Sequence, residues 1–325
     1  MKQRIITRTV CVVLIVLAAF FSVSCTKQAS EPINIVALKG PTAMGLAQLA
    51  TEYAGGEDAE YAFSLESQPE LVGPMLLQGE CDLAALPANL AAALYNKSEG
   101  KIQVIAINTL GVLYLAENGD SIKNVSDLRS KTIYSAGKGA TPEIVLRIVL
   151  ENNGIDPDKD VKLVFVSEHA EVVARMSAEE GSVGHLPEPY LTVASGKNPS
   201  IRRAVDLNSA WTDIYGEASP LITGVLVGRK DFLQEHKEEV KVFCERYGYS
   251  ANFAVENIDA AAKMISDLNI FEELPARKAL PECNIVYIDG EDMKTQLSAY
   301  LETLFSVNPQ VVGNKLPSDD FYFTP

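Results

Sequence analysis

The feature that most constrains the fold is the segment 33–53, in which an apolar run, a glycine–proline break and a helical pattern follow one another. Residues 33–38 are almost continuously apolar, which is typical of a strand buried on both faces. In residues 46–53, apolar side chains recur at i, i+3, i+4 and i+7 and predict a helix that packs back onto the strand. Ligands of open α/β sheets bind at the carboxyl ends of strands, where the free N–H groups of the next helix point. An ordinary turn explains the break equally well, but the pattern makes ligand-binding candidates of Gly40, Pro41, Thr42 and Ala43.

Two more buried strands follow, each with a polar side chain at its carboxyl end. The first is predicted over 81–86 and precedes an alanine-rich helix, so that Asn89 is a ligand candidate whose alternative role is to cap that helix. The second is predicted over 102–107, and Thr109 follows it as a further candidate.

From residue 113 the alternation of strand and helix starts again. Strands are predicted over 113–116, 132–136, 161–166 and 182–186. Glycines, a proline and a glutamate in 137–143 mark another helix N-terminus, but the spacing does not fit a Walker A loop, because Lys138 lies between two glycines. Ligand-binding candidates in this second series are Gly139, Ala140 and Thr141.

Glu188 lies between Pro187 and Pro189 at the end of a predicted strand, where the prolines restrict the backbone. Its carboxylate would suit an amine or a ring N–H group, whereas pairing with an arginine or lysine is the alternative. Trp211 is a candidate for stacking on a flat ligand, although aromatic residues at such spacing are more often part of the core.

The N-terminus resembles a bacterial lipoprotein signal. Three basic residues precede the apolar run 10–21, which is too short to span a bilayer, and Ser22-Val23-Ser24-Cys25 resembles a lipobox. We therefore expect cleavage of residues 1–24, lipidation (palmitate) of Cys25 and a tether over 25–32, with an uncleaved anchor as the alternative. Ser22 departs from the lipobox pattern, in which leucine is usual.

The composition argues against nucleic-acid binding and against catalysis. The formal net charge is −15, and it becomes more negative without the three basic residues of the signal. The histidines, His169, His185 and His236, have no partner at metal-ligand spacing, and no Gly-x-Ser-x-Gly motif occurs. We expect no enzyme activity, no cofactor and no metal. The sequence leaves open whether two of Cys81, Cys244 and Cys283 form a disulfide.

Four motifs, in this order behind the lipobox, resemble the solute-binding lipoproteins of the nitrate, sulfonate, taurine and thiamine-precursor group of ABC importers. They are residues 38–45, 79–84, 186–190 and 223–227, and the match extends over about 33–268. The resemblance implies an α/β, two-lobed type II periplasmic-binding-protein fold, in which each lobe is a mostly parallel sheet flanked by helices. It implies a discontinuous first lobe, 33–111 and 222–325, and a second lobe, 112–221, joined by hinges near 108–113 and 219–224.

The resemblance also implies a function. The chain would be exported, anchored by its lipid on the outer face of a bacterial cell membrane, and would close two lobes around a small molecule. Its partners would be the ligand, an ABC permease and the ATPase of that importer. A nitrogen heterocycle or amine is the ligand favoured by Glu188, with an alkanesulfonate or another small anion as the alternative. A ligand-sensing receptor without transport fits the sequence equally well.

Overall fold

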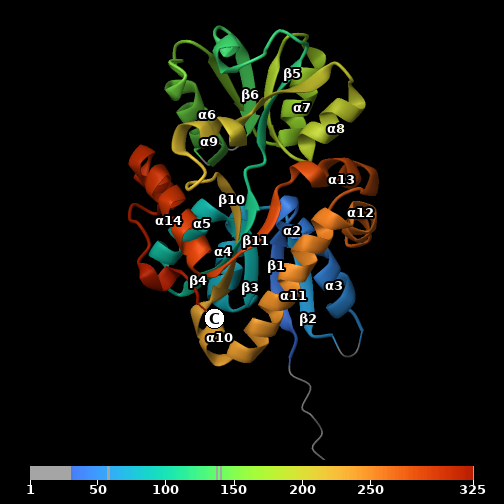
Figure 1. Ribbon diagram of the computed structural model, residues 1–325, viewed down its shortest axis with the longest axis vertical. Helices are drawn as coiled ribbons and strands as arrows, with labels where there is room; N and C mark the ends of the chain where they lie inside the picture. Colours follow the sequence, from blue (N-terminus) through green and yellow to red (C-terminus); the bar gives the residue numbers. More distant parts are fainter. Residues whose placement is uncertain (1–30, 57–58, 137, 140, 325) are drawn as a thin grey trace, which may run out of the picture. The chain divides into compact units, whose positions relative to one another are not determined.

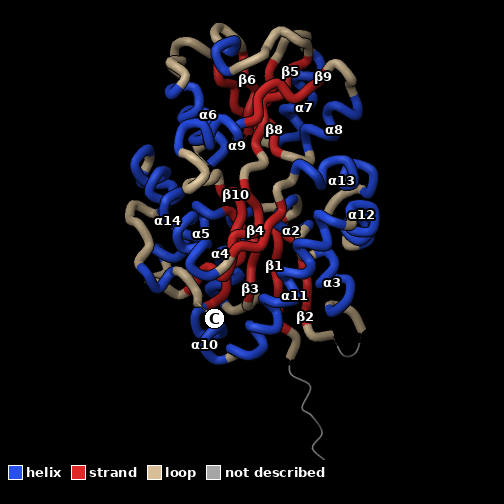
Figure 2. Tube along the Cα trace, viewed as in Figure 1, coloured by secondary structure: helices blue, strands red, loops and turns tan. Residues whose placement is uncertain are grey.

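Two β-sheets flanked by helices organise the computed structural model of the chain, which describes residues 31–56, 59–136, 138–139 and 141–324 (Figure 1, Figure 2). The strands are β1 (Ile33–Leu38), β2 (Tyr61–Glu66), β3 (Leu83–Pro87), β4 (Ile102–Leu110), β5 (Leu113–Asn118), β6 (Thr132–Ala136), β7 (Lys162–Val166), β8 (Val183–Pro187), β9 (Ile201–Asp206), β10 (Ile222–Arg229) and β11 (Ile285–Ile288). The α-helices are α2 (Pro41–Met44), α3 (Ala47–Tyr53), α4 (Pro69–Gln78), α5 (Ala88–Lys97), α6 (Thr141–Asn152), α7 (His169–Ala178), α8 (Tyr190–Lys197), α9 (Leu207–Tyr215), α10 (Lys230–Glu235), α11 (Lys237–Glu256), α12 (Ile258–Asp267), α13 (Glu273–Ala279) and α14 (Gly290–Val307). Short 3₁₀ helices are η1 (Val125–Leu128), η2 (Leu280–Glu282), η3 (Pro309–Val312) and η4 (Asp319–Phe321). Ile33–Pro325 forms one compact unit.

The first sheet has the strand order β11-β4-β10-β3-β1-β2. β1 pairs in parallel with both β2 and β3, and the register places Ile35 opposite Leu83. β10 returns from a distant part of the sequence and lies antiparallel between β3 and β4. The sheet therefore joins early strands to late ones, and its parallel core is interrupted by one reversed strand.

The second sheet has the order β7-β6-β8-β5-β9. β6 is parallel to β7 and β8, whereas β5 is antiparallel to both β8 and β9. In each sheet most strands therefore run in one direction. β5 and β10 are among the reversed strands. The chain enters the second sheet through β5 and returns to the first through β10.

Successive side chains of each buried strand pack into different cores, as alternation across a sheet requires. Ile35 and Ala37 of β1 face the core of α3, α11 and α12, whereas Val36 and Leu38 face the core of α4, α5 and α14. In the second sheet, α6 and α9 cover one face and α7 and α8 the other. This two-sided burial explains why these strands appear in the sequence as continuous apolar runs.

The chain passes between the sheets through two segments. Gly111 and Val112 separate β4 from β5, and residues 216–221 separate α9 from β10. The first segment is shorter than the predicted 108–113, and the second is as long as the predicted 219–224 but lies three residues earlier, because Thr109 and Leu110 still pair with Gly224 and Ile222 in the first sheet.

Most predicted strands are found within two residues of their expected ends, but three elements were missed. β2 is an edge strand in which Tyr61, Phe63 and Leu65 alternate with smaller or polar residues, a signal that the sequence carries. α8 follows Pro189 and is only eight residues long. α9 has Asp206 as its N-cap, whose side chain accepts hydrogen bonds from the N–H groups of Asn208 and Ser209 at 2.8 and 3.3 Å. Among the described residues, no helix is both long and apolar enough to cross a membrane.

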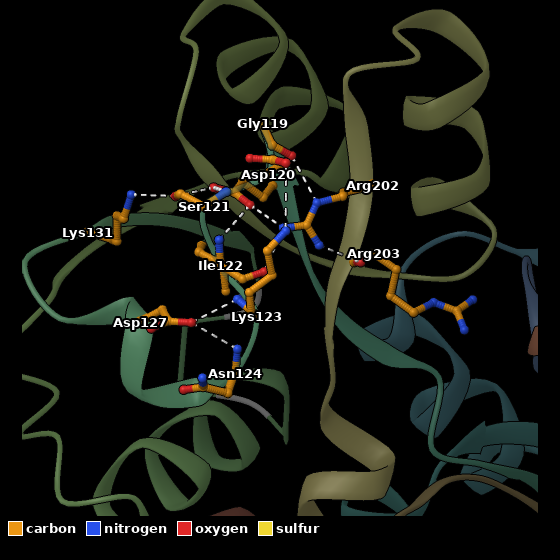
Figure 3. Close-up of polar contacts among 11 residues, drawn as sticks. Gly119, Asp120, Ser121, Ile122, Lys123, Asn124, Asp127, Lys131, Arg202 and Arg203 are labelled. Atoms are coloured by element: carbon orange, nitrogen blue, oxygen red, sulfur yellow. Dashed lines mark hydrogen bonds and ion pairs between the residues drawn. The ribbon is translucent and has the colours of Figure 1, made fainter.

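A buried carboxylate fixes the loop that follows β5 (Figure 3). Glu117 is 0% exposed, and its Oε1 accepts a hydrogen bond from the Ser121 N–H. Its Oε2 accepts a hydrogen bond from the Ile122 N–H and lies 2.6 Å from an Arg202 nitrogen. Arg202 also donates to the carbonyl groups of Gly119 and Ile122, as Figure 3 shows. Burial alone would raise the pKa of Glu117, but these hydrogen bonds and the Arg202 charge outweigh it and lower the pKa.

We predict that Glu117→Gln lowers the free energy of unfolding at pH 7 by about 1.5 to 3 kcal/mol, the range for a hydrogen bond to a charged group. Because the pKa of Glu117 is lower in the folded than in the unfolded state, its contribution is present above the usual pKa of 4.5 and is lost as the pH falls below that value. Urea titrations at several pH values should therefore show that the free energy of unfolding falls less with decreasing pH in the variant than in the parent protein.

The matched control is Glu171→Gln, which removes an exposed pair with Arg175 in the same part of the fold. It should change stability by less than about 1 kcal/mol. Equal losses in the two variants would contradict the role given to Glu117.

Candidate functional site

The predicted site residues of the first sheet lie around the carboxyl end of β1. Gly40 has φ 124° and ψ −156°, a conformation that is essentially restricted to glycine, and it precedes the short helix α2. Pro41 begins this helix and Ala43 is buried within it. The Thr42 hydroxyl donates a hydrogen bond to the Leu38 carbonyl at 3.0 Å, and this bond fixes the turn.

The structure brings Thr42 and Thr109 together with Asn108, around a glycine of β10. The Asn108 amide donates to the Thr42 carbonyl at 3.5 Å, and the Thr109 hydroxyl donates to the Asn108 side-chain oxygen at 3.1 Å. A Cβ atom on Gly224 would lie 2.5 Å from that oxygen and 2.6 Å from the Thr42 methyl carbon. Sequence reasoning did not select Asn108, although it follows a predicted buried strand as Thr109 does.

Asn89 lies apart from this cluster of interactions. Its amide donates a hydrogen bond to the Val311 carbonyl at 3.4 Å, in η3. The N-cap of α5 is Pro87, so Asn89 does not act as the predicted cap. It instead attaches a C-terminal segment to the helix that covers the first sheet.

In the second sheet, a glutamate of α6 binds the loop that precedes this helix. The Gly139 N–H donates to a Glu143 carboxylate oxygen at 2.7 Å, and the other oxygen of that carboxylate lies 2.8 Å from Arg147. Thr141 opens the helix and is buried. The Gly139 N–H is therefore already paired. Two predicted residues, Ala140 and the lipidation site Cys25, lie outside the described residues.

Glu188 is buried and has protein partners. Its carboxylate accepts a hydrogen bond from the Thr192 N–H at 3.1 Å and lies 3.7 Å from an Arg203 nitrogen. Burial raises the pKa of Glu188, and the Thr192 hydrogen bonds and the Arg203 charge oppose that rise. The carboxylate thus occupies the position foreseen by the alternative interpretation, in which it pairs with a cation of the protein.

Trp211 is completely buried. Its indole N–H donates to the Ser219 carbonyl at 2.8 Å, and its ring centroid lies 4.6 Å from that of Tyr215 and 5.6 Å from that of Tyr300. Tyr300 belongs to α14, on the first sheet, whereas Trp211 belongs to α9, on the second. In this structure Trp211 packs helices of the two sheets against each other and has no surface exposed for stacking on a ligand.

A cavity of about 770 Å³ is lined by elements of both sheets. α7 and α8 contribute from the second sheet, and α12, α13 and the loops around α13 from the first. Its charged lining residues are Lys39, Lys197, Lys278 and Glu272, and its larger apolar ones are Val173, Tyr190, Val193, Phe271, Leu274 and Pro275. Lys39 directly follows β1, next to Gly40, which connects the cavity with the loop predicted from the sequence.

Sequence reasoning missed the three lysines of this cavity. Lys39 could have been found, because it precedes Gly40 at the carboxyl end of the first predicted strand. Lys197 and Lys278 are exposed residues on helices that are distant in the sequence, and no local pattern connects them. A smaller cavity of about 420 Å³, lined by Leu76, Gly100 and Arg229, includes none of the predicted residues.

Two histidines, in α7 and β8, have pKa values well below the usual range. Burial lowers the pKa of His169 to about 4, and burial with the nearby His169 lowers that of His185 to about 3. The His169 ring lies 5.1 Å from that of Tyr190, a lining residue, and His185 Nδ1 lies 3.0 Å from the Ser135 hydroxyl. The described part of the chain contains no group of three metal-ligating side chains.

Comparisons with known proteins relate the chain to one group. A family model described as "ABC transporter, phosphonate, periplasmic substrate-binding protein" matches residues 66–270, more than half of the chain. No curated protein sequence matches significantly.

Solved structures resemble this one over nearly its whole length. An ABC transporter protein from Parabacteroides distasonis is 23% identical, with a TM-score of 0.76 over 90% of this chain and 99% of that one. The periplasmic aliphatic sulphonate-binding protein SsuA from Escherichia coli is 14% identical, with a TM-score of 0.70 over 91% and 92%. A ligand-binding component of an import system from Staphylococcus aureus is 16% identical, with a TM-score of 0.64 over 91% and 97%. At such identities the likeness shows the fold, and it confirms the predicted α/β periplasmic-binding-protein class.

We predict that Gly224→Ala destabilises the protein by about 1 to 3 kcal/mol, because the added methyl group would force Thr42 and Asn108 apart. The control is Gly196→Ala in α8, where a Cβ atom meets nothing within 4 Å. That variant should be as stable as the parent or up to about 1 kcal/mol more stable. Urea denaturation measures both, and equal stability of the two variants would contradict the close packing around Gly224.

Proposed function

This chain belongs to the phosphonate-type periplasmic substrate-binding proteins of ABC transporters, and we propose that it captures a small organic anion between two lobes and delivers it to a membrane permease. The family consists of transport proteins, not enzymes, and we propose no reaction and no cofactor for this chain. The permease and its ATPase are the proposed partners. A sensor that presents its closed form to a receptor is the second candidate, and neighbouring genes for a permease and an ATPase would distinguish the two.

The proposed lobes are 33–111 with 222–325, and 112–221. The two separate sheets and the short segments between them support this division. A ligand that contacts both lobes stabilises the closed form only by its greater affinity for that form. The cavity lined by α8 and α13 offers such a ligand surfaces from both lobes.

The observation that carries the choice of ligand is the set of three lysines in the lining of that cavity. Lys39 and Lys278 come from the first proposed lobe and Lys197 from the second, with Glu272 as the acidic lining residue. A phosphonate or sulfonate group carries negative charge and suits ammonium donors. Tyr190 and Phe271 would pack against the apolar part of the ligand, since their rings lie 6.3 Å apart beside the lysines.

The nitrogen heterocycle or amine that the sequence favours depends on a Glu188 carboxylate that is free to meet the ligand. That carboxylate contacts the Thr192 N–H and lies near Arg203, and Glu188 is not among the residues that line the cavity. We therefore prefer the anion. The Escherichia coli and Xanthomonas axonopodis proteins of the same fold are described as binding sulfonates, the latter with MOPS bound, which supports this class.

We predict that MOPS or ethylphosphonate raises the thermal stability of the purified protein, whereas adenine and spermidine do not. A ligand present at 100 times its Kd should add about 2.7 kcal/mol. Lys39→Gln should weaken binding of the stabilising anion by roughly fivefold, since an exposed charge pair contributes up to about 1 kcal/mol. Calorimetric titration measures the affinities.

The matched control is Lys241→Gln, at an exposed position of α11 that does not line the cavity. It should leave the affinity unchanged, as should Glu188→Gln if the ligand is an anion. Stabilisation by adenine or spermidine, with a loss of about 1.5 to 3 kcal/mol of binding in Glu188→Gln, would instead establish the nitrogenous ligand.

We also propose that Cys25 is lipidated and holds the protein on the outer face of the cell membrane. The support is the lipobox-like sequence before it and the tether-like composition of 26–32. Mass spectrometry of the membrane fraction should find a diacylated Cys25 at the mature N-terminus. Cys25→Ser should accumulate as a precursor that retains residues 1–24, and an unmodified, uncleaved parent chain would disprove the lipidation and establish the uncleaved anchor.

A further inference from the structure

A short segment of the first sheet contacts the strand that opens the second sheet. Residues 282–284 comprise the last residue of η2 and the two residues before β11. The Tyr114 hydroxyl, from β5, donates to the Glu282 carbonyl at 3.0 Å, and the Asn284 amide donates to the Gly111 carbonyl. The Leu110 N–H donates to the Asn284 carbonyl at 3.0 Å. The two sheets are therefore linked here by side chains as well as by the chain itself.

An arginine of the second sheet completes this contact. Arg203, in β9, places one guanidinium nitrogen 2.9 Å from the Glu282 carboxylate and another 3.7 Å from that of Glu188. The centre of the guanidinium group lies 4.2 Å from the centroid of the Tyr114 ring. Glu188 and Tyr114 both belong to the second sheet or its loops, so Arg203 is oriented by its own lobe, and Glu282 is the partner from the other lobe.

This arrangement differs from an ordinary surface ion pair. A typical exposed pair contributes little, because both long side chains must be ordered when it forms. Here the aromatic ring and the Glu188 carboxylate hold Arg203, whose side chain is 33% exposed, whether or not Glu282 is present. Most of the entropy cost of ordering the Arg203 side chain is thus independent of the contact between the lobes.

We propose that Arg203 and Glu282 form a latch that keeps the two lobes together before any ligand binds. The latch rests on the proposed closure of two lobes, but it needs no particular ligand. It determines the fraction of ligand-free protein that is in the binding-competent form, and the apparent Kd equals the intrinsic Kd divided by that fraction. Opening the latch would therefore weaken the binding of every ligand of this site by the same factor.

Cys283, next to Glu282 in the sequence, is a natural reporter of this contact. It is 0% exposed, and burial, with the negative charges of Glu188 and Glu282, raises the pKa of its thiol. Cys81 and Cys244 are also free and buried in cores of the first sheet. Cys283 shares the core of Cys244, with its thiol 3.9 Å from the Met44 sulfur, but among the three it is the one whose neighbour in the sequence is Glu282. Cys81 and Cys244 serve as internal references for local or global unfolding.

The test is the rate of thiol labelling by N-ethylmaleimide in the full-length, ligand-free protein, followed at each cysteine by peptide mass spectrometry. Glu282→Ala should accelerate the labelling of Cys283 by up to about fivefold, as expected for the loss of one partly exposed pair, and should leave Cys81 and Cys244 unchanged. Glu273→Ala is the matched control, because Glu273 pairs with Arg277 at the same 2.9 Å and with similar exposure, but within α13. It should leave all three rates unchanged.

Arg203→Gln should accelerate the labelling of Cys283 as Glu282→Ala does. In the double variant, Cys283 should be labelled no faster than in either single variant. Hydrogen exchange of the Leu110 amide, which depends on Asn284, should rise in parallel. The latch would be disproved by unchanged rates and exchange in Glu282→Ala, by additive effects in the double variant, or by equal effects of Glu273→Ala. Because no ligand is added, failure of MOPS and ethylphosphonate to bind would count against the proposed ligand and not against the latch.

Discussion

The first sheet depends on one strand that arrives late in the sequence. β10 hydrogen-bonds to β3 on one side and to β4 on the other, so without it β4 and β11 would be detached from β1, β2 and β3. The more than one hundred residues between β4 and β10 build the second sheet. The close contact of Gly224 with Thr42 and Asn108 occurs on this same strand, which therefore links the assembly of the sheet to the geometry beside the ligand cavity.

The sequence was sufficient to predict most buried strands, but not the edge strand β2 or the partners of the polar candidate residues. Buried strands are short apolar runs ended by glycine or proline, and that information is local. The role of a polar side chain depends on what the fold brings to it. Asn89 meets Val311 and Trp211 meets Tyr300, partners more than eighty residues away. The free N–H groups expected at the start of α6 include one that Glu143 already satisfies, a detail that depends on side-chain geometry.

The net charge of the chain does not predict the charges around the cavity, just as local sequence does not predict the partners of a polar side chain. The chain carries a formal net charge of −15, yet the cavity lined by α8 and α13 has three lysines in its lining. Net charge describes the field far from the protein, whereas a bound anion responds to the groups within a few ångströms. Glu188 shows the opposite effect, because a negative charge that the sequence places at a strand end is not available to a ligand. Its carboxylate accepts a hydrogen bond from the Thr192 N–H and lies near Arg203. Neither result follows from the residue types alone.

The burial of Trp211 has an optical consequence. It is the only tryptophan of the chain, and it lies between Tyr215 of its own helix and Tyr300 of the helix that covers the other sheet. Excitation at wavelengths that tyrosine does not absorb therefore gives emission from a single known position at the contact between the sheets. The two tyrosines are close enough to transfer excitation energy to this indole, so the protein contains its own donor and acceptor pair for following the separation of α9 from α14.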